Sequence, residues 1–385
     1  MKYIFRKIRY LYLAAAADTV GFFLLWLFSP KRPFSTRDLK KVLLIRMDHL
    51  GDVLLSTGTP KAIKENIPEA KLTFLTSSWA APLLDQNPFI DEVLIFDAQW
   101  FLQKRYERKA SSLGFWELVH LLKKRKFDLG IGLRGDAREN QMMWLAGIRE
   151  RIGYGVTGGG FFLTKEVHYR KRIHEKDRLV NLLRPLGIRG DLFKSRLYLS
   201  DRELVQADER LASLGLAKND RLVGFQFGAG TLSKDWEEDL ILDLLERFGK
   251  EFPSYRVILV GTRADQPGLE RAAQMGHCVD LVRKTTLREL CALMTRLRFF
   301  IGPDSGPTHI AAALGIPSIF LFSGTNRFEE WRPLAEFATA LRHPVKCSPC
   351  GLKVCNVPGH PCMSGIRPED VLKVLRERLT EERAA

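Results

Sequence analysis

Three loops of the sequence place reactive side chains next to small residues, and the first of them ends on a carboxylate. It runs from Arg46 to Asp52 and follows the apolar run 42–45. Asp52 could take a proton from an attacking hydroxyl group, and the N-terminus of the following helix should lower its pKa and keep it ionised. Asp48 and His49 are rival bases in the same loop. An N-cap role, which aspartate often has at a helix start, would explain Asp52 as well.

The second loop, 228–236, has the composition of a diphosphate-binding turn. Gly228 and the glycine two residues later allow a ligand to approach the backbone closely. Thr231 and Ser233 add hydroxyl groups, and Lys234 adds a positive charge. A plain turn with a surface lysine remains the alternative, because a Gly-x-Gly pattern is weak evidence by itself.

The third loop, 301–315, joins a glycine-rich turn to a small-residue helix that should start near Thr308. Free N–H groups at such a helix start can bind a phosphate. Asp304 could hold a sugar hydroxyl group. His309 could contact the same ligand, and a histidine at the edge of a core is the alternative for this position.

A fourth segment, 134–138, also follows an apolar run and carries Arg134 and Asp136. Its place at the end of a strand indicates a contact with a second substrate, the acceptor of a transferred group. A surface ion pair is the alternative.

Alternating strands and helices must position these loops. Short apolar runs predict buried parallel strands at 42–45, 72–75, 92–96 and 127–133, and again at 222–225, 256–260, 299–301 and 318–322. Helical segments lie between them, which is the pattern of α/β domains with doubly wound parallel sheets. Ligands of such sheets bind beyond the carboxyl ends of the strands. We therefore expect two Rossmann-like domains facing a central cleft, with the site in that cleft.

The net charge of the chain is +15, which favours an anionic partner such as a lipid, a phosphorylated substrate or a nucleic acid. Residues 1–41 contribute +7 of it, from nine basic and two acidic residues. Neither an RNP-like aromatic motif nor zinc-finger spacing accompanies the charge, so nucleic acid is the weaker choice. We expect no nucleic-acid partner.

An apolar segment at 11–28 contains a single charged residue, Asp18. A cleaved signal peptide fits the basic start but not Asp18 or the Trp-Leu-Phe-Ser-Pro end. A membrane-spanning helix is possible, and so is a helix packed on the domain. The basic residues on both sides and the aromatic side chains favour an interfacial membrane anchor.

Four of the six cysteines fall close together, with the spacing C-x2-C-x4-C-x6-C; they are Cys347, Cys350, Cys355 and Cys362. Four thiolates could bind zinc, although this spacing is not a standard pair of zinc-binding pairs. Free or buried thiols in a structural loop are the alternative. A chain of this size does not need disulfides to fold, which favours a reducing compartment.

Together the loops resemble glycosyltransferase family 9, the ADP-heptose:lipopolysaccharide heptosyltransferases. The resemblance runs from about residue 41 to 378, with the motifs in the family's order. It is carried by the segments 42–57, 228–230, 233–236, 260–262 and 302–317, and by Trp331-Arg-Pro.

The resemblance implies a GT-B fold and an inverting transfer that needs no metal or other cofactor besides a nucleotide-sugar co-substrate, expected to be ADP-heptose. Its acceptor would be a lipid-linked saccharide of the lipopolysaccharide core, at an anionic membrane surface. The enzyme would then be peripheral or monotopic, on the cytoplasmic face of the inner membrane.

By the same resemblance, Asp52 is the general base. The donor would be held by Thr231, Lys234, Asp304, Ser305, Gly306, Thr308 and His309, and its nucleoside by the region of Gly261, Thr262 and Asp265. Arg134 and Asp136 are the acceptor candidates. No metal-ligating residue is expected in the site.

These expectations divide the chain into five parts. They are a membrane-associating helical segment (1–40), an acceptor-binding domain (41–185), a linker (186–221), a nucleotide-sugar-binding domain (222–345), and a cysteine-containing tail with a C-terminal helix (346–385).

Two other functions fit the same residues. One is the same fold and mechanism with another nucleotide sugar and a different surface glycan or lipid as acceptor. The other is a non-catalytic, membrane-associated protein that binds a nucleotide sugar. A binding protein needs no base, so the presence of Asp52 together with Lys234 and Asp304 argues against it.

Overall fold

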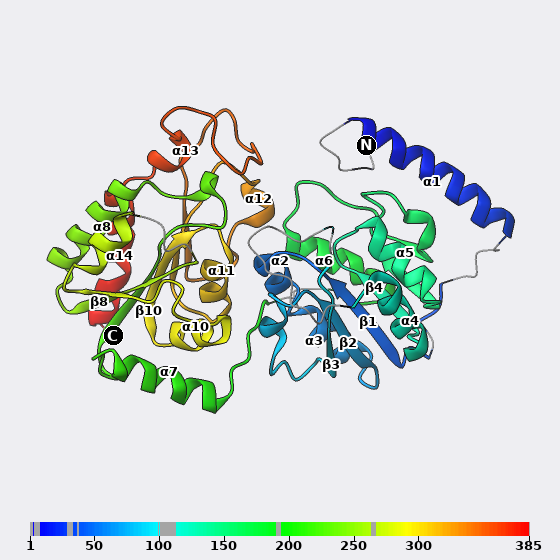
Figure 1. The fold of residues 1–385 in the computed structure, drawn as a ribbon, viewed down its shortest axis with the longest axis horizontal. Helices are drawn as coiled ribbons and strands as arrows, with labels where there is room; N and C mark the ends of the chain where they lie inside the picture. The colour runs from blue at the N-terminus through cyan, green and yellow to red at the C-terminus, as the bar shows by residue number, and fades with distance from the viewer. Residues whose placement is uncertain are drawn as a thin grey trace. The chain divides into compact units, whose positions relative to one another are not determined.

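The computed structural model describes residues 3, 8–28, 34–36, 38–98, 100, 113–189, 194–262 and 267–384. The chain forms two compact units, residues 1–198 and 199–385 (Figure 1). Their boundary falls inside the segment 186–221. The first helix of unit 2, α7 (Asp201–Ser213), also lies in that segment, and a capping box of Ser200 and Glu203 begins it.

Unit 1 is built on a parallel sheet of six strands in the order β3-β2-β1-β4-β5-β6. The strands are β1 (Lys41–Arg46), β2 (Lys71–Thr76), β3 (Glu92–Ile95), β4 (Leu129–Gly132), β5 (Glu150–Gly153) and β6 (Lys165–Glu166). The helices are α2 (Leu50–Leu55), α3 (Thr59–Asn66), α4 (Phe115–Arg125), α5 (Ala137–Leu145) and α6 (Glu175–Leu183), with 3-10 turns η1 (Ala81–Leu84), η2 (Gly160–Phe162) and η3 (Arg184–Leu186).

Unit 2 repeats this architecture, with the strand order β12-β11-β10-β7-β8-β9. Its strands are β7 (Arg221–Gln226), β8 (Tyr255–Val260), β9 (Cys278–Asp280), β10 (Leu297–Pro303), β11 (Ser318–Leu321) and β12 (Ala338–Leu341). After α7 come η4 (Leu232–Lys234), α8 (Glu238–Glu251), α9 (Pro267–Ala273), α10 (Leu287–Met294), α11 (Gly306–Ala313), α12 (Phe328–Trp331), α13 (Pro361–Ser364) and α14 (Pro368–Ala384).

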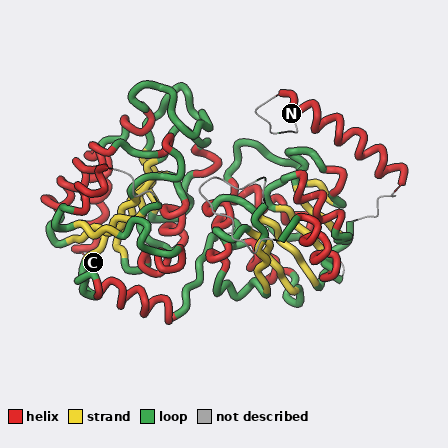
Figure 2. The backbone as a smooth tube through the Cα atoms, in the orientation of Figure 1, coloured by secondary structure: helices red, strands yellow, loops and turns green. Residues whose placement is uncertain are grey.

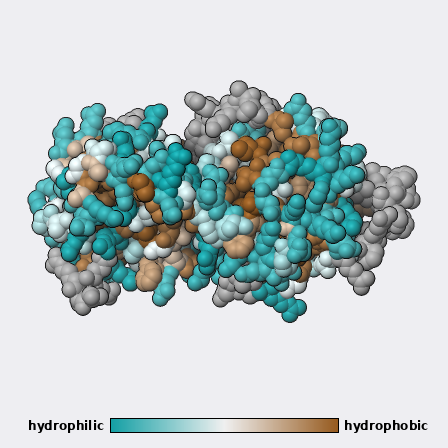
Figure 3. Space-filling view, turned by 90° about the horizontal axis from the view of Figure 1, so that it is seen from below, coloured by the Kyte–Doolittle hydropathy of each residue, from teal (hydrophilic) through white to brown (hydrophobic). Residues whose placement is uncertain are grey.

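Burial explains why the central strands form. The β1 residues Val42 to Ile45 have no exposed surface, as expected for a strand covered by helices on both faces of a parallel sheet. Figure 2 shows the yellow strands of each unit with red helices beside them. On the face drawn in Figure 3, hydrophilic residues cover much of each unit, and hydrophobic residues show between them. The expected α/β class with two parallel sheets is confirmed.

The strand order explains where the candidate loops lie. In each unit the first strand is at the centre, and the next strands are added first on one side and then, from the fourth strand on, on the other. The order therefore reverses between β1 and β4 and between β7 and β10. Ligands of open α/β sheets bind beyond the carboxyl ends of the strands at this switch point. All four candidate loops follow one of these four strands.

The apolar N-terminal segment forms α1 (Ile8–Phe28), the dark blue helix of Figure 1. It contacts η2. Within the described part of the chain, no helix combines the length and the apolar character needed to cross a membrane. The basic residues Lys2, Arg6, Lys7, Lys31, Arg32 and Arg37 lie outside the described residues. Membrane association of this helix stays a prediction.

Candidate active site

In unit 1, the guanidinium group of Arg46 gathers three carboxylates at the carboxyl end of β1. Its Nη2 atom lies 3.1 Å from Asp52 Oδ1 and 2.9 Å from Glu175 Oε1, and its Nε atom lies 3.4 Å from Asp48 Oδ2. Nη1 donates a hydrogen bond to the carbonyl of Leu133, just beyond β4. Burial works against the positive charge, but the carboxylates outweigh it and raise the pKa of Arg46. A permanent cation therefore joins the loops on the two sides of the switch point.

Asp52 lies in the first turn of α2 but does not cap it, because the N-cap residue is His49. The N-cap interpretation is therefore wrong. Burial, followed by the charge of Asp48, raises the pKa of Asp52 to about 8, and Arg46 offsets only part of this rise. The expectation that the helix lowers this pKa is also wrong, because desolvation and neighbouring carboxylates outweigh the partial charge of a six-residue helix. A carboxylate that titrates near the working pH is well suited to act as a general base.

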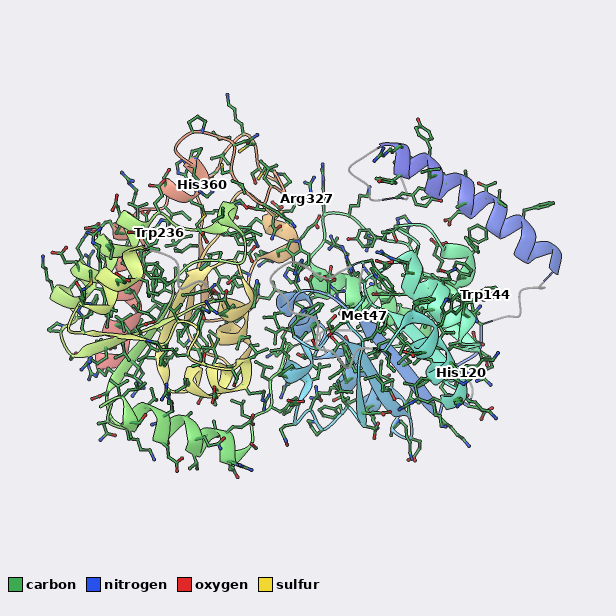
Figure 4. All side chains as sticks on the ribbon, viewed as in Figure 1. Met47, His120, Trp144, Trp236, Arg327 and His360 are labelled. Carbon is green, nitrogen blue, oxygen red and sulfur yellow. The ribbon has the colours of Figure 1, made fainter. Side chains whose placement is uncertain are left out.

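Arg134, an expected acceptor residue, contacts the same loop. Its Nη1 atom donates to the carbonyl of Met47 at 3.2 Å, and its Nε atom lies 3.5 Å from Asp48 Oδ2. Met47 directly follows β1 and is labelled in Figure 4. Asp48 is held further by the backbone N–H of His49, at 3.0 Å. The contact thus links Arg134 to Arg46 and Asp52 through Asp48.

Asp136, the other acceptor candidate, is the N-cap of α5 and pairs with Arg138. It accepts hydrogen bonds from the Arg138 backbone N–H at 3.0 Å, from Nε at 2.8 Å and from Nη2 at 2.6 Å. Burial alone would raise the pKa of Asp136, but Arg138 outweighs it and lowers the pKa. The ion-pair interpretation therefore describes Asp136, which has a structural role whether or not it also meets an acceptor.

In unit 2, Asp304 brings together the second and third loops. Its Oδ2 atom accepts hydrogen bonds from Lys234 Nζ at 2.8 Å and from Asn326 Nδ2 at 2.9 Å, and its Oδ1 atom lies 3.0 Å from His309 Nε2. Lys234 also donates to the Asp304 carbonyl at 2.7 Å. Lys234 belongs to the loop that follows β7, and these contacts fix its side chain at the end of β10.

The charge state of Asp304 follows from these partners. Its side chain is 4% exposed, and burial alone would raise its pKa. The positive charge of Lys234 and the hydrogen bond from His309 outweigh burial and hold the pKa well below its ordinary value. Asp304 is therefore ionised at neutral pH and keeps Lys234 oriented. The core-edge interpretation of His309 also has support, because its ring packs edge-on against Phe320 with centroids 4.9 Å apart.

The start of α11 is not closed by a side chain. Ser305 is the N-cap residue but makes no capping hydrogen bond, because its hydroxyl group donates to Gln226 Oε1 at 2.6 Å. The first intrahelical backbone hydrogen bond is from His309 N–H to the Ser305 carbonyl. The N–H groups of Gly306 and Thr308 come before it and therefore have no carbonyl partner within the helix. The Thr308 hydroxyl is turned inward and donates to the Pro303 carbonyl at 2.7 Å. The first turn of α11 can therefore receive an anion through backbone N–H groups.

Thr231 supplies a second group suited to a ligand. Its Oγ1 atom is buried and has no hydrogen-bond partner among the described residues. Such a hydroxyl group normally finds a partner in a folded protein. Its place in the second loop, three residues from Lys234, fits the expected role at a diphosphate.

The cysteine-containing loop packs around the residue next to Lys234. Ser233 Oγ donates to the Leu352 carbonyl at 2.5 Å, and Ser233 N–H donates to the Lys353 carbonyl at 3.0 Å. The ring of His360, labelled in Figure 4, lies with its Nε2 3.1 Å from the Ser233 carbonyl. This loop therefore braces the turn that carries Lys234.

The four clustered cysteines and His360 line one small pocket beside Ser233. All six cysteines are free thiols. Among the described residues, no three His, Cys, Asp or Glu side chains are placed to hold a metal ion. The thiols therefore line the loop that packs around Ser233.

The expected nucleoside region follows β8. A Cβ atom at Gly261 would clash with the carbonyl of Phe227, so a glycine is required where the chain leaves the strand. Thr262 follows it at the surface, and Asp265 lies outside the described residues. The close approach of two backbones accounts for Gly261 without a ligand.

Four residues of these clusters were not singled out from the sequence: Arg46, Glu175, Gln226 and Asn326. Arg46 belongs to the first loop, and a buried arginine in a carboxylate-rich loop is a usable signal. Gln226 ends a buried strand directly before the second loop. Glu175 and Asn326 carry no local signal, because they reach the site from elsewhere in the chain.

Comparison with known proteins gives a consistent family assignment. The family model described as glycosyltransferase family 9 (heptosyltransferase) matches residues 115–360. The lipopolysaccharide heptosyltransferase 3 of Escherichia coli K12 is 28% identical over 302 residues, which cover 75% of this chain and 84% of that protein.

Two solved structures share the fold. The glycosyl transferase family 9 protein of Veillonella parvula matches with a TM-score of 0.77 and 23% identity, covering 90% of this chain and 99% of that one. The ADP-heptose lps heptosyltransferase II of E. coli matches with a TM-score of 0.71 and 21% identity, covering 89% and 99%.

Proposed function

Because the chain belongs to glycosyltransferase family 9, the heptosyltransferase family, and is therefore a glycosyltransferase, we propose that it moves a heptose from ADP-heptose to the lipopolysaccharide core. The family matches the greater part of the chain. A relative named lipopolysaccharide heptosyltransferase 3 supports the acceptor, and a structural neighbour named for ADP-heptose supports the donor.

Asp52 is the base in this proposal, and its environment is the observation that carries it. The carboxyl group lies at the switch point of unit 1 and has a pKa raised to about 8 by burial and by Asp48. In its ionised form it can accept the proton of the attacking hydroxyl group as the bond to the sugar forms, and the raised pKa increases its affinity for that proton. A single carboxylate suffices for a displacement that inverts the anomeric centre, because no covalent sugar–enzyme intermediate is needed.

Unit 2 stabilises the leaving ADP. Lys234, fixed by Asp304 at 2.8 Å, supplies a positive charge to the diphosphate. The first turn of α11 supplies the N–H groups of Gly306 and Thr308, and the unpartnered hydroxyl of Thr231 adds a donor. Preorganised donors of this kind stabilise charge that develops on a departing phosphate. The reaction then needs no cofactor besides the nucleotide sugar.

The acceptor is, in this proposal, a lipid A-linked core saccharide, and the enzyme works on the cytoplasmic face of the inner membrane as a peripheral or monotopic protein. The net charge of +15 supports an anionic surface as partner. Asp304 and His309 remain candidates for contacts with the donor sugar, and Arg134 for contacts with the acceptor.

A donor panel tests the proposal. Purified protein is incubated with a heptose-deficient core acceptor and with ADP-heptose, other ADP-sugars, GDP-sugars or UDP-sugars, and product mass and anomeric configuration are measured. We expect one added heptose of inverted configuration from ADP-heptose alone. Preferred transfer from another nucleotide sugar would remove the heptose assignment but leave the family and its mechanism in place.

A further inference from the structure

Helix α1 is held on unit 1 by one face. Asp18 is 3% exposed, and its Oδ1 atom accepts a hydrogen bond from the backbone N–H of Gly159 at 2.7 Å. Its Oδ2 atom accepts from the hydroxyl of Tyr3 at 2.9 Å. One turn on, Phe22 meets the ring of Phe161 edge-on, with centroids 6.1 Å apart. The single charge of the apolar segment is therefore used to fix the helix to the protein.

The opposite face of α1 is apolar and exposed. With 100° between successive residues, Tyr12, Leu13, Ala16, Val20 and Phe23 lie about 120–160° around the helix from Asp18. We call these five residues the outer face. The exposed fractions are 66% for Tyr12, 63% for Leu13, 57% for Val20 and 59% for Phe23. Large apolar side chains exposed together along one helix face mark an interaction surface.

Charged side chains are kept off the outer face between Tyr12 and Phe23. Asp18 is the only charged residue between Tyr12 and Phe23, and it points to the protein. The hydroxyl of Thr19 donates to the Ala15 carbonyl at 2.9 Å, so it is satisfied within the helix. Placing the outer face in a non-polar medium would therefore leave no side-chain charge without a partner.

The net charge of residues 1–41 indicates which kind of partner the outer face contacts. Residues 1–41 carry +7, with basic residues before and after the helix. A second copy of the chain would bring the same charge against it, whereas anionic lipid headgroups neutralise it. At an anionic membrane surface, an exposed apolar helix face with basic residues in the neighbouring sequence gains both buried apolar area and electrostatic attraction.

We propose that the outer face of α1 is the membrane-contact surface of this protein, and that Asp18 fixes how unit 1 is oriented on an anionic bilayer. The Asp18 contact continues toward the candidate site. Thr157, two residues before Gly159, accepts from the Ala137 backbone N–H at 2.8 Å and donates to the Gly135 carbonyl at 3.1 Å. The loop that holds α1 thus also holds the segment after β4.

Vesicle binding by the full-length protein tests the inference. Sedimentation is measured with phosphatidylcholine vesicles with and without phosphatidylglycerol, at low and high salt. The test variant is Leu13→Glu/Val20→Glu/Phe23→Glu. The matched control is Ile95→Glu/Trp116→Glu/Val205→Glu, which changes the same number of exposed apolar residues (48%, 69% and 55% exposed) outside α1.

We expect wild type and control to bind phosphatidylglycerol vesicles alike, and the test variant to lose at least about tenfold in binding. Equal binding by the test variant, or an equal loss in the control, would overturn the proposal. Wild-type dimers that the test variant cannot form, together with unchanged vesicle binding, would show a second copy as the partner and also overturn it.

The inference rests on the proposed function for its setting at a lipid surface, but the two can fail separately. Vesicle binding needs neither nucleotide sugar nor acceptor. Transfer to a detergent-dispersed acceptor is measured in parallel. If the test variant loses vesicle binding but retains transfer, the inference is supported. If the wild-type protein shows no heptosyl transfer but the test variant still loses vesicle binding, only the proposed function is contradicted.

Discussion

Arg46 and Asp52, at the two ends of one loop, form an ion pair of 3.1 Å that is nevertheless too weak to hold the carboxyl at its ordinary pKa. Burial is the main cause of the raised pKa, and Asp48 and Glu175, which share the same guanidinium group, raise it further. The positive charges of Arg46 and Arg134 offset only part of this rise. The loop therefore combines a fixed base position with a raised proton affinity.

The Asp52→Asn variant should lose nearly all transfer activity. The amide cannot accept the proton of the attacking hydroxyl group, and a general base typically contributes about 10²–10⁴-fold to the rate. Because the pKa of Asp52 is raised to about 8, wild-type kcat/KM should rise with pH and level off above that value. Transfer rates across the pH range measure both effects.

Binding of ADP provides the control for Asp52→Asn. The donor elements belong to unit 2, so the affinity for ADP should stay near that of wild type. Full transfer activity in this variant would remove Asp52 from the base role, and a shared loss of ADP binding would indicate misfolding instead.

The neighbours of Asp52 should move the pH profile in opposite directions. Glu175→Gln removes a negative charge that raises the pKa of Asp52, and Arg46 then has one carboxylate fewer to neutralise. The pH at which kcat/KM rises should therefore be lower than in wild type. Arg46→Met removes the cation and should shift this rise to higher pH. Arg46→Met should also cost about 3–5 kcal/mol of unfolding free energy, because buried carboxylates lose their partner.

The test compares the pH profiles of kcat/KM and the unfolding curves of Glu175→Gln and Arg46→Met with those of wild type. Identical pH profiles for Glu175→Gln and wild type would show that the charge cluster does not tune Asp52. Arg46→Lys serves as the conservative control, since it keeps the charge without the forked geometry.

Lys234→Met should weaken the binding of ADP, and it should also destabilise the fold because the buried Asp304 loses its cation. A charge-assisted contact with a phosphate contributes about 1.5–3 kcal/mol, which corresponds to a loss of about tenfold to 150-fold in affinity. Calorimetric titration with ADP gives the affinity, and titration with adenosine gives the control. Adenosine lacks the diphosphate, so an equal loss for both ligands would contradict a diphosphate contact by Lys234.

Asp304→Asn should change the acid stability of the protein. The pKa of Asp304 is lowered by Lys234 and His309 despite burial. Its ionised form therefore stabilises the fold above the ordinary aspartate range near pH 4, and this contribution is lost as pH falls toward the folded pKa. The variant should unfold more easily than wild type at pH 7, and the difference should narrow in acid. A constant difference at every pH would contradict this account.

Much of the fold could be predicted because its central strands are apolar runs. Each of the eight expected strands is present, from Val42–Ile45 to the run that ends at Phe322. The four strands that were not expected, β5, β6, β9 and β12, lie toward sheet edges and are short or contain charged residues. The sequence Glu-Arg-Ile-Gly of β5 shows no apolar run, and pairing with β4 and β6 makes it a strand.

The sequence could predict only those residues of the candidate site that lie in loops after central strands. Asp52, Lys234 and Asp304 follow β1, β7 and β10, so topology alone places them at the switch points. Glu175 reaches Arg46 from 129 residues away in the chain, and no local pattern identifies such a partner. The raised pKa of Asp52 could not be foreseen for the same reason, since it depends on burial and on that distant carboxylate.

Ser233→Ala tests whether the cysteine-containing loop positions Lys234. The variant loses the hydrogen bond from Ser233 Oγ to the Leu352 carbonyl, at a cost of about 1 kcal/mol, which lowers Tm by about 2–4 °C for a unit of this size. If the brace orients Lys234, the KM for the donor should rise while kcat on saturating donor changes little. Ser213→Ala, at the exposed end of α7 where the hydroxyl donates to the Arg210 carbonyl of its own helix, is the matched control and should leave KM unchanged. A Ser233→Ala enzyme with lowered Tm but wild-type KM would show that the loop stabilises unit 2 without positioning the lysine.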